Sequence, residues 1–91
     1  MLILISYDVV ADRRRTKLAS VLEDFGRRVQ YSVFECLLEE SDLEELVPRL
    51  EGLIEAQEDS VRIYRLCARC QDRVEILGKG AVTEEPQVYV L

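Results

Sequence analysis

The sequence predicts an α+β domain in which two helices cover one face of an antiparallel sheet. Three observations lead to this prediction: an almost entirely apolar opening run, two stretches with helically spaced apolar residues, and extended segments around them. The chain has 91 residues, of which 48% are apolar and 33% are charged. Because this length and composition are typical of one folded unit with a modest core, we expect residues 1–91 to form a single domain.

The first predicted elements are a strand and a helix. Residues 2–8 are nearly all apolar, which is typical of a central strand buried on both faces. Asp12 is expected to cap the helix that follows, and Gly26 stands where a left-handed residue would end it. The buried face of this helix is predicted from apolar positions that recur three or four residues apart: Leu18, Val21, Leu22 and Phe25.

A long extended stretch and a second helix come next. Residues 28–38 alternate as a strand does but are long for one strand, so we expect a bend or break near Ser32. The helix is predicted from a capping box between Ser41 and Glu44. Pro48 lies inside it, so we expect either a kink or a helix that begins near Pro48. The predicted buried positions of this helix are Leu43, Leu46, Val47, Leu50 and Ile54.

Three further strands are predicted over residues 59–67, 74–77 and 87–91, with a flexible turn at residues 78–80. If the stretch 28–38 divides into two paired strands, the elements follow the βαββαβ order of the ferredoxin-like fold. Many unrelated functions share this fold, so the function has to be inferred from the residues themselves.

The charge is distributed very unevenly along the chain. The net charge of −6 argues against binding to a polyanion, because such binding depends on lysine and arginine. However, residues 13–28 carry six basic side chains against two acidic ones, whereas residues 35–59 carry ten acids against Arg49 alone. One face can therefore be basic and attract phosphates, although charged runs are also the ordinary solvated faces of helices.

The sequence also indicates where the protein resides. No run is long and apolar enough for a membrane span, and the opening run lacks the basic start and cleavage site of a signal peptide. We therefore expect a cytoplasmic protein without a membrane partner. Three cysteines, an odd number, argue against a disulfide framework.

Asp8 is the candidate catalytic and metal-binding residue. An acid at the end of a buried strand, followed by cations, can hold a metal ion beside a phosphate, and Mg²⁺ needs few protein ligands. The chain has no histidine, the general base of many nucleases, so we expect any hydrolysis to be weak or strongly metal-dependent. The alternative is that Asp8 caps the turn into the first helix. The neighbouring cations are Arg13, Arg14, Arg15 and Lys17.

Aromatic and hydroxyl side chains near the strand ends have two interpretations each. Tyr7 and Phe34 can stack on bases or pack in the core, while Tyr31 is expected in the core. Ser32 can donate to a phosphate or satisfy the break in the strand.

Cys67 and Cys70 have the spacing of a zinc-binding or dithiol pair. Zinc requires four ligands, and Cys36 is the one cysteine left. A dithiol redox pair would need a helix to start at it, and none is evident in the sequence. We therefore expect two small residues at a tight turn.

Five short segments occur in an order and at a spacing that resemble one protein family. They are Tyr7 to Val9, Arg13 to Lys17, Gly26 to Gln30, Ser32 to Glu35, and Asp59 to Tyr64. Together they closely resemble the CRISPR-associated Cas2 family, the small subunit of the spacer-acquisition machinery, over residues 1–64. The turn at residues 78–80 and the short terminal strand also fit this family.

The resemblance implies a homodimer of ferredoxin-like domains in which residues 87–91 pair with the sheet of the partner subunit. It implies Mg²⁺-dependent endonuclease activity on RNA or DNA, with Asp8 as the metal-binding acid, and a complex with the CRISPR integrase. It further implies that six residues line the same cleft or touch nucleic acid: Tyr7, Arg15, Lys17, Arg28, Ser32 and Phe34. The basic cluster itself adds Arg13, Arg14 and Arg27 as candidates for nucleic-acid binding.

Two further functions remain open on the sequence. The chain could be a non-catalytic structural adaptor of the integration complex, for which Asp8 would be dispensable. It could also be a regulatory domain that binds a small ligand between subunits. Contacts to a phosphate backbone carry no base code, so the sequence does not distinguish RNA, single-stranded DNA and duplex DNA as substrates.

Overall fold

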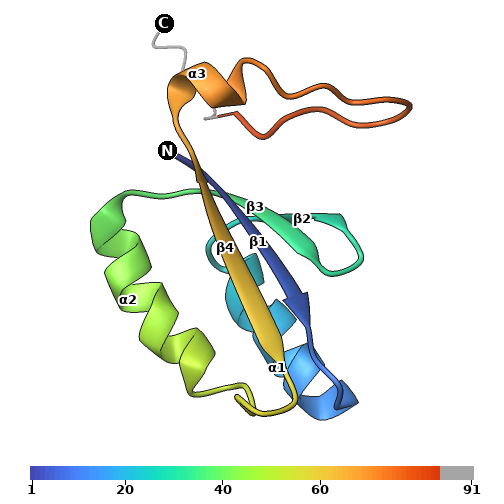
Figure 1. Ribbon diagram of the computed structural model, residues 1–91, viewed down its shortest axis with the longest axis vertical. Helices are drawn as coiled ribbons and strands as arrows, with labels where there is room; N and C mark the ends of the chain where they lie inside the picture. Colours follow the sequence, from blue (N-terminus) through green and yellow to red (C-terminus); the bar gives the residue numbers. More distant parts are fainter. Residues whose placement is uncertain (85–91) are drawn as a thin grey trace, which may run out of the picture.

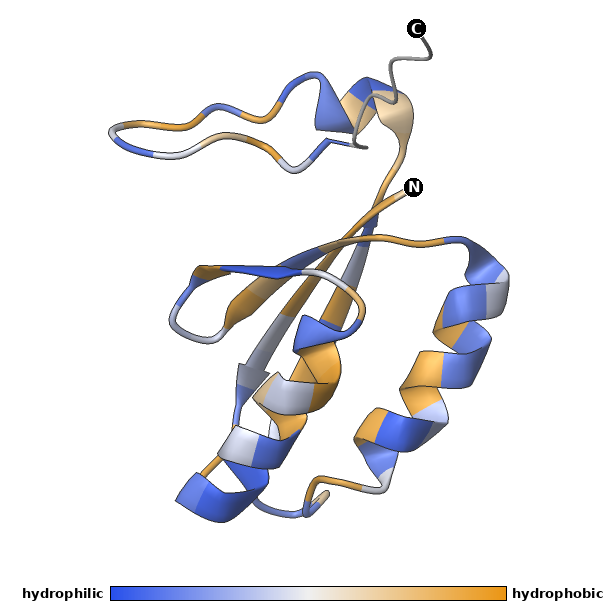
Figure 2. Ribbon diagram, turned by 180° about the vertical axis from the view of Figure 1, so that it is seen from behind, coloured by the Kyte–Doolittle hydropathy of each residue, from blue (hydrophilic) through white to orange (hydrophobic). Residues whose placement is uncertain are grey.

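The computed structural model describes residues 1–84, which form a four-stranded antiparallel sheet with two long helices on one face (Figures 1 and 2). The strands are β1 (Leu2–Asp8), β2 (Arg27–Gln30), β3 (Val33–Leu37) and β4 (Ser60–Leu66), in the order β2-β3-β1-β4. The helices are α1 (Asp12–Glu23), α2 (Glu40–Glu51) and the short α3 (Ala68–Gln71). This order and connectivity confirm the predicted ferredoxin-like βαββαβ arrangement. In the part of the chain described, no helix has the length and apolarity that a bilayer crossing needs.

Strand β1 lies in the middle of the sheet, as predicted from its apolar run. It pairs with β3 on one side and β4 on the other, so that Ile5 lies opposite both Phe34 and Ile63. Ile3, Ile5 and Tyr7 face the helices and are buried, whereas Leu4 and Ser6 face the other side and are half-buried. The sheet thus has one covered face and one open face.

The core lies between the covered face of the sheet and the two long helices. The predicted apolar stripes of both helices supply it, since Leu18 and Leu22 of α1 and Leu46 of α2 have no exposed surface. In Figure 2 the apolar sides of both helices turn toward the sheet. The expected break near Ser32 is also confirmed, because residues 31–32 form the turn between β2 and β3.

The ends of α1 differ from the prediction. Asp12 is the first helical residue, and Ala11 takes the cap position without a side-chain hydrogen bond. Gly26 does not adopt the left-handed conformation expected of it. A Cβ atom at Gly26 would instead collide with the Sγ atom of Cys36 and the carbonyl oxygen of Glu35. Glycine is needed there because the chain after α1 approaches β3 so closely.

The start of α2 also differs. Its capping box joins Glu39 and Asp42, where the backbone N–H of Glu39 donates to Asp42 Oδ2 over 2.9 Å. The predicted box at Ser41 is therefore wrong by two residues. The helix begins at Glu40 and continues through Pro48 to Glu51, which excludes a start near Pro48. Pro48 is exposed, so its missing N–H group lies on the solvent side of the helix.

Residues 72–84 form an irregular excursion that leaves α3 and returns, drawn in orange and red in Figure 1. The predicted strand over residues 74–77 is wrong, because within residues 1–84 the backbone of these residues pairs with no strand. The predicted turn is present, with positive φ angles of 91° at Gly78 and 127° at Gly80. The strand expected over residues 87–91 lies outside the described residues.

Candidate metal and nucleic-acid site

Asp8 is the last residue of β1 and lies opposite Ser60 of β4. Its neighbour Tyr7 faces the helices, so the alternation of a strand turns Asp8 to the open face of the sheet. Asp8 is exposed, and its carboxylate forms no ion pair with another residue of 1–84. The acid is therefore accessible to a cation from solvent.

The turn from β1 into α1 is held by Asp59. The side chain of Asp59 is fully buried, and its two oxygens accept the backbone N–H groups of Val10, over 3.0 Å, and Glu55, over 2.8 Å. This contact weakens the alternative that Asp8 caps the turn. Asp59 is a residue whose role sequence analysis missed, although it opens one of the five segments that carry the family resemblance.

Arg14 completes the site of Asp59. Its Nε and one terminal nitrogen donate to the two carboxylate oxygens over 2.8 and 3.2 Å, and the same nitrogen also reaches Glu58 over 3.1 Å. The hydrogen bond from Arg14 holds the pKa of Asp59 well below its usual range, against the opposing effect of burial. The same bond raises the pKa of Arg14. Since both oxygens of Asp59 accept hydrogen bonds from Arg14, we assign the Arg14–Asp59 ion pair a role in holding the fold together.

The residues of the predicted basic cluster therefore fall into two groups: two form contacts within the chain, and two are exposed to solvent. Arg14 is committed to Asp59, and Arg15 donates to the carbonyl oxygen of Val9 over 2.8 Å and pairs with Asp12. Arg13 and Lys17 are exposed and form no ion pair within the described part of the chain. These two side chains are the members of the cluster best placed to meet a phosphate.

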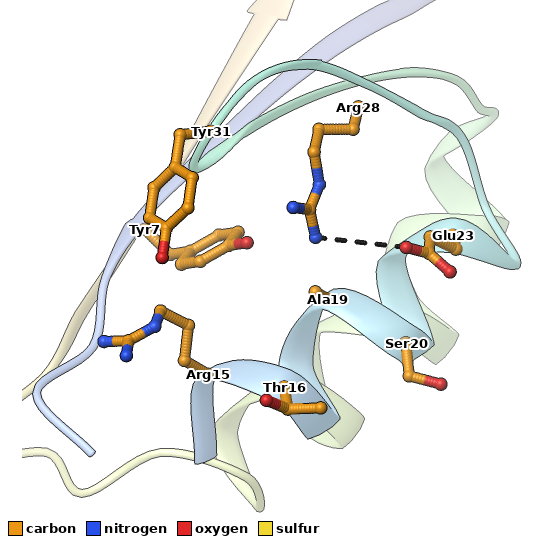
Figure 3. A pocket seen from close by; sticks show the side chains of 8 residues that line it. All are labelled: Tyr7, Arg15, Thr16, Ala19, Ser20, Glu23, Arg28 and Tyr31. Atoms are coloured by element: carbon orange, nitrogen blue, oxygen red, sulfur yellow. Dashed lines mark ion pairs between the residues drawn. The ribbon is translucent and has the colours of Figure 1, made fainter. Parts of the chain in front are cut away.

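A hollow of about 260 Å³ lies between α1 and the turn that joins β2 to β3 (Figure 3). Arg28 of β2 forms one side of it and is 3.9 Å from the carboxylate of Glu23, while Arg15 of α1 lies beyond the ring of Tyr7. The two guanidinium groups could bind a phosphate, and the exposed ring of Tyr31 could stack on a base. The lining residues are Tyr7, Arg15, Thr16, Ala19, Ser20, Glu23, Arg28 and Tyr31.

Two aromatic side chains can be assigned from their exposure. Phe34 has no exposed surface, which supports its core alternative over contact with a base; its ring stacks on that of Tyr7 and lies 5.3 Å from the guanidinium of Arg28. Tyr31, expected in the core, is 74% exposed at the rim of the hollow. The turn between two strands lifts Tyr31 out of the alternation that predicted its burial.

Two other candidate residues, Arg27 and Ser32, do not line the hollow. Arg27 is on the open face, where it donates to Thr83 Oγ1 over 3.0 Å and to the carbonyl of Ala81 over 2.7 Å. The backbone carbonyl of Ser32 accepts the N–H of Tyr7 over 3.0 Å, a bond that any residue could make at this position. Both interpretations of the Ser32 hydroxyl therefore stay predictions.

The donor set limits which metal the chain could hold. No group of three or more His, Cys, Asp and Glu side chains suited to a metal ion occurs in residues 1–84. A single accessible carboxylate such as Asp8 does not suit zinc, which needs a nearly complete protein shell. It does suit Mg²⁺, which retains most of its waters and shares phosphate oxygens.

Comparison with known proteins agrees with this fold. The family model described as CRISPR associated protein Cas2 matches residues 1–74. The chain is 47% identical to the CRISPR-associated endoribonuclease Cas2 1 of Chloroflexus aurantiacus, with full coverage of both. It superimposes on the crystal structure of Streptococcus pyogenes Cas2 with a TM-score of 0.76 and 37% identity, covering 86% of this chain and all of that one. A chain of a partial Cas6-RT-Cas1–Cas2 complex gives a TM-score of 0.80 at 29% identity, covering 99% and 98%. The chain therefore belongs to the CRISPR-associated Cas2 family.

Proposed function

We propose that this chain is a Mg²⁺-dependent endonuclease subunit that acts on RNA or DNA and works as a homodimer with a CRISPR integrase. The observation that carries the proposal is the accessible carboxylate of Asp8 at the end of the central strand. The relative from Chloroflexus aurantiacus is named an endoribonuclease, which supports the nuclease part of the proposal. One of the similar solved chains belongs to a complex whose title includes Cas1, which supports the part about the integrase.

The residues around Asp8 have distinct tasks in this proposal. Mg²⁺, when held by Asp8, would supply the positive charge that polarises a phosphoryl oxygen and makes water a better nucleophile. Arg13 and Lys17 attract the phosphate backbone. The Arg14–Asp59 contact fixes the turn after β1, so that the acid and the start of α1 keep a constant spacing.

A homodimer follows from the incompleteness of one copy. Asp8 is one acid per chain, and a twofold assembly would bring a second carboxylate to the same phosphate. The open face of the sheet offers a surface for such pairing, since Leu4 and Val33 are half-buried there and Tyr64 is 44% exposed. Partly exposed apolar side chains of this kind can be buried in an interface between subunits.

The structural adaptor is the second candidate function. The observation that favours it is the commitment of Arg14 and Arg15 to intramolecular contacts, which leaves few side chains for catalysis near Asp8. An adaptor needs only to bind nucleic acid and the integrase, whereas a nuclease needs Asp8 as well.

The substitution Asp8→Asn separates the two candidates, because it keeps the shape of the side chain and removes its charge. For the nuclease, we expect Mg²⁺-dependent cleavage of labelled RNA and DNA to fall by at least about a hundredfold. Asp24→Asn is the matched control, since Asp24 is an exposed acid at the far end of α1. Cleavage that survives Asp8→Asn would remove Asp8 from the reaction, and full spacer integration by that variant would favour the adaptor.

A further inference from the structure

Two exposed thiols lie within one helical turn at the end of β4. Cys67 takes the cap position of α3 with an extended backbone, φ −66° and ψ 166°, and Cys70 is the third residue of that helix. Cys67 makes no side-chain cap hydrogen bond, but the backbone N–H of Gln71 donates to the Cys67 carbonyl oxygen over 2.9 Å, so Cys67 and Cys70 lie within one helical turn. The tight turn expected from the sequence is therefore wrong, because a short helix begins after Cys67 and brings the two cysteines to a spacing that a disulfide can bridge.

The pKa values of the two neighbouring thiols shift in opposite directions. The backbone N–H and the thiol of Cys70 lower the pKa of Cys67, and the Cys67 thiol raises the pKa of Cys70. Cys36 is different, because burial raises its pKa to about 11. A thiol with a lowered pKa is the better nucleophile near neutral pH, and one whose pKa is raised is the less reactive partner.

We propose that Cys67 and Cys70 form a reversible intramolecular disulfide by exchange with a small disulfide such as oxidised glutathione. The Cys67 thiolate attacks one sulfur of the oxidant and displaces the first glutathione as a thiol. Cys70 then attacks the Cys67 sulfur of this mixed disulfide and displaces the second glutathione. The chain loses two electrons and two protons, and the oxidant gains both, so the exchange is balanced.

The position of the pair gives the oxidation a structural consequence. Cys67 and Cys70 stand where the chain leaves β4 for the excursion of residues 72–84. Gln71, the next residue, donates to the carbonyl of Thr83 over 3.5 Å, and Thr83 in turn contacts Glu35 and Arg27 on the open face. A bond between the thiols fixes α3 and so changes how the excursion rests on the sheet.

The test uses the full chain, reduced and then exposed to excess oxidised glutathione, with alkylation and intact-mass measurement. We expect two alkylatable thiols to disappear together, without glutathione remaining on the chain, and to return on reduction. Cys67→Ser and Cys70→Ser should each lose this behaviour and instead carry one glutathione on the cysteine that remains. Cys36→Ser is the matched control and should oxidise as the unchanged protein does.

Three results would overturn the proposal. The first is that all the thiols stay alkylatable in excess oxidised glutathione, and the second is that the disulfides join separate chains on a non-reducing gel. The third is zinc that copurifies with the chain, protects both thiols and is lost in either serine variant, since this would make the pair half of a metal site shared between copies. None of these results depends on nuclease activity, so the proposal and the function of Asp8 are tested separately.

Discussion

Arg14 and Asp59 are joined by a two-pronged hydrogen bond, with Nε to Oδ2 at 2.8 Å and a terminal nitrogen to Oδ1 at 3.2 Å. The two residues lie 45 positions apart and connect the first turn of α1 to the start of β4. Asp59 also receives the backbone N–H of Val10, two residues after Asp8. The candidate catalytic acid thus lies next to a turn that a partly buried ion pair holds in place.

The substitution Asp59→Asn should destabilise the fold, because it removes the fully buried carboxylate that binds the half-buried guanidinium of Arg14 and the backbone N–H groups of Val10 and Glu55. We expect the melting temperature at pH 7 to fall by roughly 10 °C. Thermal melts followed by circular dichroism measure this, with Asp24→Asn as the control at an exposed acid. Equal melting temperatures for the two variants would contradict a structural role for Asp59.

The same ion pair predicts how stability depends on pH. The pKa of Asp59 is lowered in the folded chain, so its contribution is complete above its unfolded pKa of about 4 and is lost as the pH falls below that value. When the pH is lowered from about 5 to about 2–3, the unchanged protein should therefore lose more stability than the Asp59→Asn variant does. Parallel curves of melting temperature against pH for the two proteins would argue against this linkage.

Gly26→Ala should destabilise the fold by about 1–3 kcal/mol, because the new methyl group would press on Cys36 and on the backbone of Glu35. Gly52→Ala is the matched control: the nearest atoms to its new methyl group would lie 3.6 Å away, in ordinary contact. Gly52 also has a φ of −72° that alanine adopts freely. Urea denaturation of both variants checks the contrast, and similar midpoints would disprove the close approach.

Phe34→Ala and Tyr31→Ala should affect different properties. The first removes a fully buried ring, and we expect a loss of stability of about 3–5 kcal/mol. The second removes an exposed ring at the rim of the hollow, so stability should stay within about 0.5 kcal/mol while affinity for single-stranded nucleic acid falls. Unchanged affinity of a folded Tyr31→Ala variant would exclude the hollow as a base-binding site.

Arg13→Ala and Lys17→Ala should each weaken nucleic-acid binding and reduce the salt slope of the binding constant by about one. Filter binding over a range of salt concentrations measures both effects. Arg69→Ala on α3 is the control, because Arg69 is exposed and lies outside the basic cluster. A flat salt response of the unchanged protein would instead favour a small-ligand regulatory domain.

The local patterns of the sequence were sufficient to predict the strands and helices of residues 1–66. Alternation along β1 and the helical spacing of Leu18, Leu22 and Leu46 depend on which side of one element is buried, and such spacing is visible in the sequence itself. The predicted burial was wrong for Tyr31, which lies at a turn. The predicted strand was wrong for residues 74–77, which pair with no other strand of the described residues.

The sequence by itself determined the order of the elements, the apolar faces that form the core, and the place of Asp8 at the end of a central strand. The tertiary structure decided how the charged residues are used: Arg14 turns to Asp59, and the hollow around Arg28 lies on the opposite face of the sheet from Asp8. The physical reason is that burial patterns are periodic over a few residues and can be seen in the sequence. An ion pair such as Arg14–Asp59, or a close backbone approach such as that at Gly26, depends on which distant segments meet.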